Sequence, residues 1–352
     1  MDRIDSSFKT ESNIITRRSA LRRLTAVSGV LCLSPLATNF ASVSDADATP
    51  TYHNPILPGV AADPEFLGSH KTGRAYLYPT TSGGFRAYSS DDLVHWRDEG
   101  FVLEAKNIHW ETQKFWAPSI IERHYGGDDY RYFFYYCANE KLGVAVGTDP
   151  TGPFEDKGEI VGHDLRPKGR RGVEIDPFVF ADPISGKFYL YWGNSYLCVC
   201  ELNDDMISLK LDTKRDITPE NFFEGTYVFY RDGRYFLTWS KNDTRDPNYQ
   251  VWVATSDSPY GPFRSPEKDA IILSKRPEKN IVGTGHHSFL FLPNGHNYIA
   301  YHRIIQPQKR GGWGREVCLE RFDFLPNGDL PIIEPTHEGV GEPEDLASLL
   351  KS

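Results

Sequence analysis

Three carboxylic side chains recur in the sequence at places where each stands beside an apolar, strand-like segment. They occur in Ala62-Asp63-Pro64, Ile175-Asp176-Pro177 and Phe223-Glu224-Gly225. Two further segments, Phe115-Trp116-Ala117 and Gly285-His286-His287, extend the series. Counted from Asp63 to Trp116, Asp176, Glu224 and His286, the intervals are 53, 60, 48 and 62 residues. This regularity indicates one chemically distinct side chain for each of five repeated units.

Placing three carboxylates close together costs electrostatic free energy, because like charges repel and raise one another's pKa. Hydrolysis of a glycosidic bond is a function that requires such a group. It needs one protonated carboxyl at the leaving oxygen and one ionised carboxylate on the other side of the sugar. A third carboxylate can orient the acid and adjust its pKa. We therefore predict that Asp63, Asp176 and Glu224 are the catalytic carboxylates.

Each of these residues also has an ordinary interpretation. Asp63 and Asp176 precede proline and could be turn residues, and Glu224 could be a solvated surface side chain. Glu174 and Glu65 compete with the two aspartates, because residues two apart in a strand share a face. The repeat favours Asp63 and Asp176, so Glu65 and Glu174 are interpreted as structural.

A second pattern shows which elements must position these side chains. Short aromatic strands recur, and their anchor residues are separated by 57, 56, 47 and 62 residues. The strands are 75–78, 132–135, 188–191, 235–238 and 297–300. Five units of this length, rich in short strands, predict an all-β fold, a five-bladed β-propeller in a single domain. A large β-sandwich is the alternative, but sandwiches do not repeat at this period.

Polar turn segments repeat as well. Residues 89–96, 147–154 and 255–263 each follow a short strand, contain aspartate or serine and end in an aromatic residue. Such residues form tight turns. Because equivalent positions of all blades face the propeller axis, the five side chains of the first pattern are expected to meet in one axial pocket.

The N-terminus has a different composition. Arg17-Arg18 precedes an apolar stretch from about Leu24 to Leu36, and Ala46-Asp47-Ala48 follows. This order is typical of a secretory signal, and the paired arginines resemble a twin-arginine motif, although Ala20 stands where that motif prefers Phe. We expect residues 1–48 to be a cleaved twin-arginine signal peptide and residues 49–352 to form the catalytic propeller. The protein is then periplasmic or secreted.

This expectation can be tested directly. A precursor in which Arg17 and Arg18 are both changed to Lys is expected to remain in the cytoplasm, because the export machinery reads the arginine pair. Cell fractionation measures the outcome. Normal export of this variant would contradict a twin-arginine route.

Bulk properties narrow the choice of partners. The net charge is −9 and no basic block stands out after the N-terminal segment, which argues against a nucleic-acid partner. The apolar stretch is too short to span a bilayer, and Leu31 before Cys32 does not suit a lipoprotein signal, so no membrane anchor is expected. Cys137, Cys198, Cys200 and Cys318 are expected to be buried thiols with at most one disulfide.

The ordered set of motifs resembles glycoside hydrolase family 43. The motifs are Asn54-Pro55-Ile56-Leu57-Pro58-Gly59 with Ala62-Asp63-Pro64, Trp116-Ala117-Pro118, Glu174-Ile175-Asp176-Pro177, Phe223-Glu224-Gly225, Gly283-Thr284-Gly285-His286 and Tyr301-His302-Arg303. The resemblance implies that Asp63 is the general base, Glu224 the general acid and Asp176 the residue that positions and tunes the acid. One departure is Thr226, where members often have Pro.

The resemblance also implies roles outside the acids. Trp116 is expected to contact the sugar or to pack in the core. Arg303 is expected to bind a sugar hydroxyl or to pair with a catalytic carboxylate, with a surface arginine as the alternative. His286 is expected on the axis near a bound water or one calcium ion, which it would reach through water. The chemistry itself requires no cofactor.

The expected partner is an oligosaccharide or polysaccharide. The resemblance implies an inverting hydrolase, with α-L-arabinofuranosidase and β-xylosidase as the commonest activities. The chain nearly ends at Thr336-His337-Glu338-Gly339-Val340, without the added β-sandwich of many xylosidases, which tilts the choice toward arabinofuranosidase. A galactofuranosidase, an endo-arabinanase and a catalytically silent sugar-binding propeller remain alternatives.

Overall fold

The computed structural model describes residues 53–268, 270–307 and 314–351. All of the described residues belong to one compact unit. The segment expected to be an export signal lies outside the described residues. Within them, no helix is long and apolar enough to cross a membrane.

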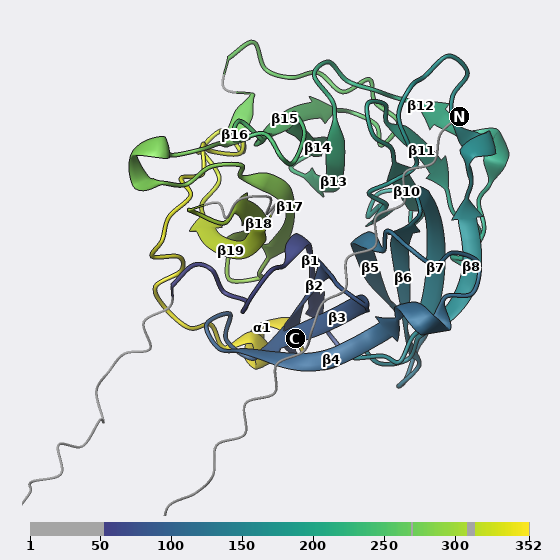
Figure 1. Ribbon diagram of the computed structural model, residues 1–352, viewed down its shortest axis with the longest axis horizontal. Helices are drawn as coiled ribbons and strands as arrows, with labels where there is room; N and C mark the ends of the chain where they lie inside the picture. Colours follow the sequence, from purple (N-terminus) through teal and green to yellow (C-terminus); the bar gives the residue numbers. More distant parts are fainter. Residues whose placement is uncertain (1–52, 269, 308–313, 352) are drawn as a thin grey trace, which may run out of the picture. The chain divides into compact units, whose positions relative to one another are not determined.

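Five antiparallel sheets surround a central axis, as Figure 1 shows, and this confirms the predicted five-bladed β-propeller. Blade 1 consists of β1 (Ala62–Ser69), β2 (Arg74–Thr81), β3 (Gly84–Ser90) and β4 (Trp96–Glu104). Blade 2 consists of β5 (Trp116–His124), β6 (Tyr130–Ala138), β7 (Lys141–Gly147) and β8 (Glu155–Val161). Blade 3 consists of β9 (Phe178–Ala181), β10 (Phe188–Trp192), β11 (Cys198–Glu201) and β12 (Arg215–Asp216). Blade 4 consists of β13 (Glu224–Arg231), β14 (Arg234–Lys241), β15 (Gln250–Ser256) and β16 (Ile271–Leu273). Blade 5 consists of β17 (Gly285–Phe291), β18 (Asn297–Ile304) and β19 (Arg315–Phe322).

The aromatic strands found in the sequence are the second strands of the blades, and both of their faces are buried. In β6, Phe134 packs toward blade 1, whereas Phe133 and Tyr135 pack toward blade 3. Five hydrophobic clusters of this kind lie between successive blades and join them into a ring. Burial on both faces explains why these strands are continuous apolar runs and do not alternate with polar residues.

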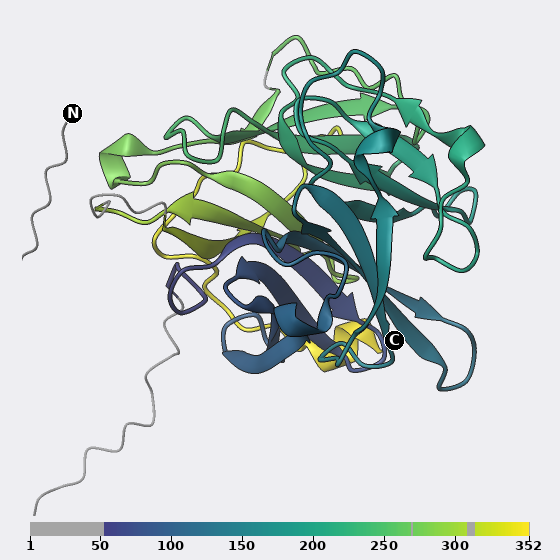
Figure 2. The same ribbon diagram turned by 45° about the vertical axis from the view of Figure 1, so that its right-hand side comes forward.

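Both ends of the described chain close the ring. The segment before β1 lies along β19, where the Ile56 amide donates to the Val317 carbonyl at 2.9 Å and the Ala61 amide to the Arg315 carbonyl at 3.0 Å. Among the described residues the only α-helix is α1 (Leu346–Leu350), which packs against blade 1 (Figure 2). The segment before β1 therefore completes blade 5, which otherwise has three strands.

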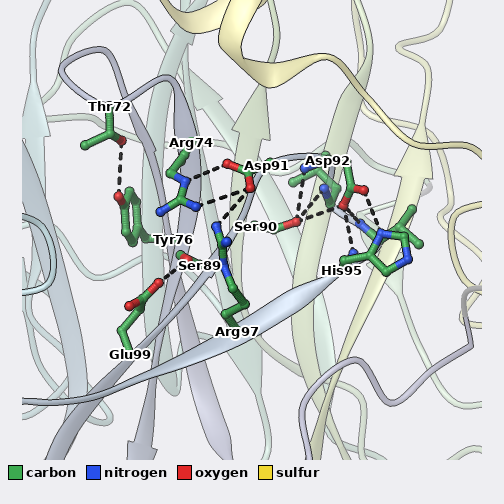
Figure 3. A network of polar contacts seen from close by, with 12 residues as sticks. Thr72, Arg74, Tyr76, Ser89, Ser90, Asp91, Asp92, His95, Arg97 and Glu99 are labelled. Carbon is green, nitrogen blue, oxygen red and sulfur yellow. Dashed lines mark hydrogen bonds and ion pairs between the residues drawn. The ribbon is translucent and has the colours of Figure 1, made fainter.

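The polar turn segments form capped turns between the third and fourth strands. In blade 1, Asp92 Oδ1 accepts from the amides of Val94 and His95 at 2.9 and 2.8 Å, and Ser90 Oγ accepts from the Leu93 amide at 2.8 Å (Figure 3). In blade 2, Asp149 Oδ1 accepts from the Thr151 amide at 2.9 Å. Asp92 and Asp149 thus end the third strands of blades 1 and 2 by local hydrogen bonding.

The cysteines lie within the blades. Cys137, Cys198, Cys200 and Cys318 are all buried and free, as the sequence allowed. Burial raises the pKa of Cys198 to about 12, so its thiol stays protonated and unreactive. These residues act as small apolar side chains in the core.

Candidate active site

The innermost strands of four blades bulge at the same point. Their registers shift between Ala62 and Glu65, Trp116 and Ser119, Glu224 and Tyr227, and Gly285 and Ser288. A residue with left-handed backbone lies within each bulge: Asp63 (φ 49°), Ala117 (φ 38°), Gly225 (φ 65°) and His286 (φ 43°). Asp176 of the third blade has the same conformation, with φ 56°. A bulge bends the strand and changes where a side chain points.

These bulges correct one detail of the predicted repeat. Trp116 and Glu224 are not structurally equivalent to Asp63 and His286, because they lie one residue earlier in the bulge and correspond to Ala62 and Gly285. The bulge presents residues at both positions to the axis. Left-handed backbone costs about 1–3 kcal/mol for a non-glycine residue and is concentrated at functional sites.

The predicted residues meet around one cavity of about 440 Å³. Its lining includes Asp63, Trp116, Asp176, Glu224 and His286. The other lining residues are Glu140, Ile175, Asp243, Thr244, Arg245, Ile304 and Arg315. The axial convergence expected from the sequence is therefore present, and the volume is that of a small-molecule site.

Asp63 is surrounded by basic side chains. Its Oδ1 lies 3.0 Å from Arg315 Nη1, 3.1 Å from His302 Nδ1 and 3.3 Å from His286 Nδ1. Burial alone would raise the pKa of Asp63. The Arg315 guanidinium, followed by His286 and His302, outweighs burial and holds the pKa well below its usual range. Asp63 is thus ionised at neutral pH, as a base must be.

The pKa of Glu224 is shifted in the opposite direction from that of Asp63. Burial, reinforced by the charge of Asp63, raises the pKa of Glu224 to about 7, even though the Tyr249 hydroxyl donates to Oε1 at 2.9 Å. Asn194 Nδ2 donates to Oε2, also at 2.9 Å. Two carboxyl groups in one pocket with pKa values displaced in opposite directions can act as a base and an acid.

Asp176 lies beside the acid. Burial, followed by the charges of Glu224 and Asp63, raises the pKa of Asp176 well above its usual range. Its Oδ2 accepts from the Gly225 amide at 2.9 Å, so it holds the backbone next to Glu224. This contact gives Asp176 a positioning role, as the resemblance implied.

Glu174 and Glu65, the alternatives to Asp176 and Asp63 in the sequence, lie outside the cavity. Glu174 is buried against Arg166, whose Nε donates to Oε1 at 2.7 Å, and against Tyr196, whose hydroxyl donates at 2.6 Å. Glu65 accepts from Ser119 Oγ at 3.0 Å, and burial raises the pKa of Glu65 to about 8. Neither residue lines the cavity. The structural interpretation of both fits these contacts.

Arg303 is placed away from the cavity. Its side chain is buried, its Nε donates to Glu316 Oε1 at 2.7 Å and its Nη1 donates to the Thr336 carbonyl at 2.9 Å. Neighbouring residues of a strand face opposite sides, so His302 reaches Asp63 while Arg303 points to the C-terminal segment. The cation beside the predicted base is Arg315, which the sequence analysis did not single out.

Arg303→Gln is accordingly expected to lower the free energy of unfolding by about 3 kcal/mol, because it leaves Glu316 without its buried partner. The kcat/KM is expected to stay within about twofold of wild type. Urea unfolding and initial rates measure both quantities, with exposed Arg321→Gln as the control. Unchanged stability together with lost activity would contradict this placement.

Several other residues at the site also escaped the sequence analysis. They are Tyr249, Asn194, Thr244 and His302. His302 belongs to the motif Tyr301-His302-Arg303. The site residue in this motif is therefore His302, whereas the sequence pointed to its neighbour Arg303. The other three lie in loops after second strands, where no repeated pattern marks them.

A second cavity of about 370 Å³ shares Trp116 and Arg315 with the first. The hairpin residues Thr80, Thr81 and Ser82 line it. The two cavities therefore adjoin at Trp116 and Arg315, which line both. An aromatic face beside hydroxyl groups suits a sugar.

Comparison with known proteins supports the resemblance. The profile described as Glycosyl hydrolases family 43 matches residues 52–330. The chain is 35% identical over 308 residues to the Aspergillus niger protein named beta-D-galactofuranosidase xynD, covering 82% of this chain and 86% of that one. A crystal structure of a thermostable family-43 glycoside hydrolase matches with a TM-score of 0.69 and 28% identity, covering 84% of this chain and 99% of that one. A structure of an alpha-L-arabinofuranosidase from Clostridium thermocellum matches with a TM-score of 0.65 and 27% identity, covering 79% and 95%.

Proposed function

Because the chain belongs to glycosyl hydrolase family 43 and is a glycoside hydrolase, we propose that it is an inverting exo-glycosidase that releases terminal furanosyl residues. The observation that carries the mechanism is the pair of carboxyls with opposite pKa shifts in one cavity. Asp63 activates water, and Glu224 protonates the departing oxygen. Asp176 positions Glu224 through the Gly225 amide.

The bond changes follow from these states. A water that gives its proton to Asp63 attacks the anomeric carbon while the bond to the leaving oxygen breaks. Glu224 donates its proton to that oxygen in the same step. Asp63 as base, and not as nucleophile, is the role that the family resemblance implies, and it leads to inversion.

We propose a terminal α-L-arabinofuranosyl group as the first candidate substrate. Relatives carry this activity in their names, including the Clostridium thermocellum structure and the arabinoxylan arabinofuranohydrolases of Paenibacillus polymyxa and Bacillus subtilis. A β-xylosyl group is the close competitor, because another relative is named beta-xylosidase.

A β-D-galactofuranosyl group is the second candidate, and two observations favour it. The 35% identical relative is named a galactofuranosidase. The ring of β-D-galactofuranose has the configuration of α-L-arabinofuranose and adds one exocyclic carbon with its hydroxyl. The adjoining cavity beside Trp116 and Arg315 offers room for that longer chain.

A panel of p-nitrophenyl glycosides tests the proposal. Turnover of the α-L-arabinofuranoside or the β-D-galactofuranoside is expected to exceed that of the β-D-xylopyranoside. Arabinan and arabinoxylan should release monosaccharide only. Oligosaccharide products would indicate endo-arabinanase action, and failure to turn over any glycoside would favour a sugar-binding propeller.

Glycoside hydrolysis by two carboxyls needs no cofactor. For calcium, the ligand atoms of Asp176, Glu224 and His286 lie within 4.8 Å of one another. Calcium takes six to eight oxygens, whereas this group offers two carboxyls with raised pKa values and one imidazole. The group does not fit a directly bound calcium ion, and a calcium ion that His286 reaches through water stays a prediction. Isothermal titration with CaCl₂ after EDTA treatment tests it: stoichiometric binding heat would support the water-mediated ion, and the absence of heat would contradict it.

A further inference from the structure

One loop touches both halves of the catalytic pair. It joins β14 to β15 and runs from Asn242 to Tyr249. At its end, the Tyr249 hydroxyl donates to Glu224 Oε1 at 2.9 Å. Near its start, Thr244 Oγ1 lies 3.0 Å from His302 Nε2 and accepts from Arg315 Nη1 at 3.1 Å. His302 and Arg315 are two of the three basic residues that contact Asp63 Oδ1, the third being His286.

Thr244 is placed to control the proton of His302. The Asp63 amide donates to His302 Nδ1 at 3.1 Å, and Asp63 Oδ1 lies 3.1 Å from the same nitrogen. Because Nδ1 accepts from the amide, the imidazole proton lies on Nε2 and is donated to Thr244 Oγ1, which also accepts from Arg315 Nη1. Thr244 therefore holds the tautomer of His302 whose Nδ1 fixes the backbone of Asp63. The bond made by one ring nitrogen sets the proton of the other.

Tyr249 connects the same loop to the acid. Its ring is fully buried and stacks on His302, with centroids 5.5 Å apart and planes 3° from parallel. A Cβ at position 285 would clash with the Tyr249 ring, so Gly285 of blade 5 leaves the space that this ring occupies. Tyr249 thus contacts the acid by a hydrogen bond and the base through the His302 ring.

The loop itself is held in shape by hydrogen bonds. The Asp246 amide donates to the Asp243 carbonyl at 2.7 Å, and the Tyr249 amide donates to the Asp246 carbonyl at 2.9 Å. Its Pro247 carbonyl accepts from the Gly283 amide at 3.0 Å, which ties the loop to the segment before β17. A loop fixed in this way can transmit its position to the two carboxyls.

We propose that Thr244 and Tyr249 are positioning residues, through which the β14–β15 loop sets the orientation and protonation of the base Asp63 and the acid Glu224. This inference rests on the proposed roles of those two carboxyls. Neither loop residue takes or gives a proton in the reaction. The Thr244 hydroxyl acts on Asp63 through His302 and Arg315, whereas the Tyr249 hydroxyl acts on Glu224, so removing each hydroxyl should move a different limb of the pH profile.

Thr244→Val removes the hydroxyl and nearly keeps the shape. With His302 and Arg315 less well held, Asp63 loses part of the support that keeps it ionised. The acidic limb of the pH profile of kcat/KM is expected to move up by about one pH unit, and kcat to fall about tenfold. The KM should change little. Thr244→Ser keeps the hydroxyl and should restore the wild-type profile.

Tyr249→Phe removes the hydrogen bond that favours ionised Glu224. The pKa of Glu224 should therefore rise, and the basic limb should move up by about one pH unit while the acidic limb stays. Thr255→Val and Tyr230→Phe, in the same blade, are matched controls that should leave both limbs in place. Circular dichroism and thermal unfolding show that each variant is folded.

The outcomes separate the possibilities. Each limb moving with its own variant supports the inference. Lower thermal stability with both limbs unmoved would show that the loop is only structural and would overturn it. If Asp63 and Glu224 variants retain normal activity, the proposed function itself fails, which is a different result from unmoved limbs in loop variants alone.

Discussion

Asp63→Asn is expected to lower kcat/KM by about 10⁴-fold for every substrate, whatever its leaving group. Asparagine has nearly the same shape but cannot accept a proton from water. The loss should not depend on the leaving group, because the base acts on the nucleophile. Aryl furanosides whose phenols span a range of pKa values measure this, and the loss should be the same across the series.

The chain offers a matched control for this variant. Glu65 is two residues away, is equally buried, and has its pKa raised to about 8 by that burial. It is therefore protonated at neutral pH, and Glu65→Gln exchanges one neutral group for another. Near-normal turnover is expected. A rate for Asp63→Asn within tenfold of wild type would remove Asp63 from the role of base.

Glu224→Gln is expected to lose activity in a leaving-group-dependent way. Natural sugar leaving groups need a proton, so kcat/KM should fall about 10³-fold, whereas a dinitrophenyl glycoside should lose less than about tenfold. Glu220→Gln, four residues earlier and exposed, is the control. Equal losses for both classes of substrate would argue against Glu224 as the acid.

The pH profile gives a second readout of the same variant. Glu224 acts in its protonated form, and burial raises its pKa to about 7. Wild-type activity should therefore fall as the pH rises through about 7. The acidic limb belongs to Asp63 and should lie at low pH, because that pKa is held well below its usual range. In Glu224→Gln the basic limb should be absent, since glutamine does not titrate.

The repeat in the sequence was sufficient to predict the propeller and the convergence of its axial side chains. The repeat length matches one blade of a propeller. The continuous apolar strands mark the second strand of each blade, which is buried on both faces. Asp63, Asp176, Glu224, His286 and Trp116 all line one cavity for that reason. What the repeat could not show was the bulge, which changes the register by one residue and presents Glu224 from a different position than Asp63.

The blade repeat could not identify the residues that position the catalytic carboxyls and shift their pKa values. Thr244 and Tyr249 lie in a single loop, and no repeated partner marks them. Arg315 begins β19, and no repeated motif includes it. Arg303 was chosen in its place because it belongs to a recognisable motif, but strand alternation turns it to Glu316. A loop contact across the axis depends on the closed ring, which local sequence does not encode.

The configuration of the first-formed sugar tests the central claim most directly. Proton NMR during hydrolysis of an aryl furanoside, recorded before mutarotation, identifies the anomer. If Asp63 activates water for direct displacement, the sugar appears with inverted configuration. A retained anomer, or a glycosyl azide of retained configuration formed by Glu224→Gln in azide, would show a covalent intermediate and contradict this account.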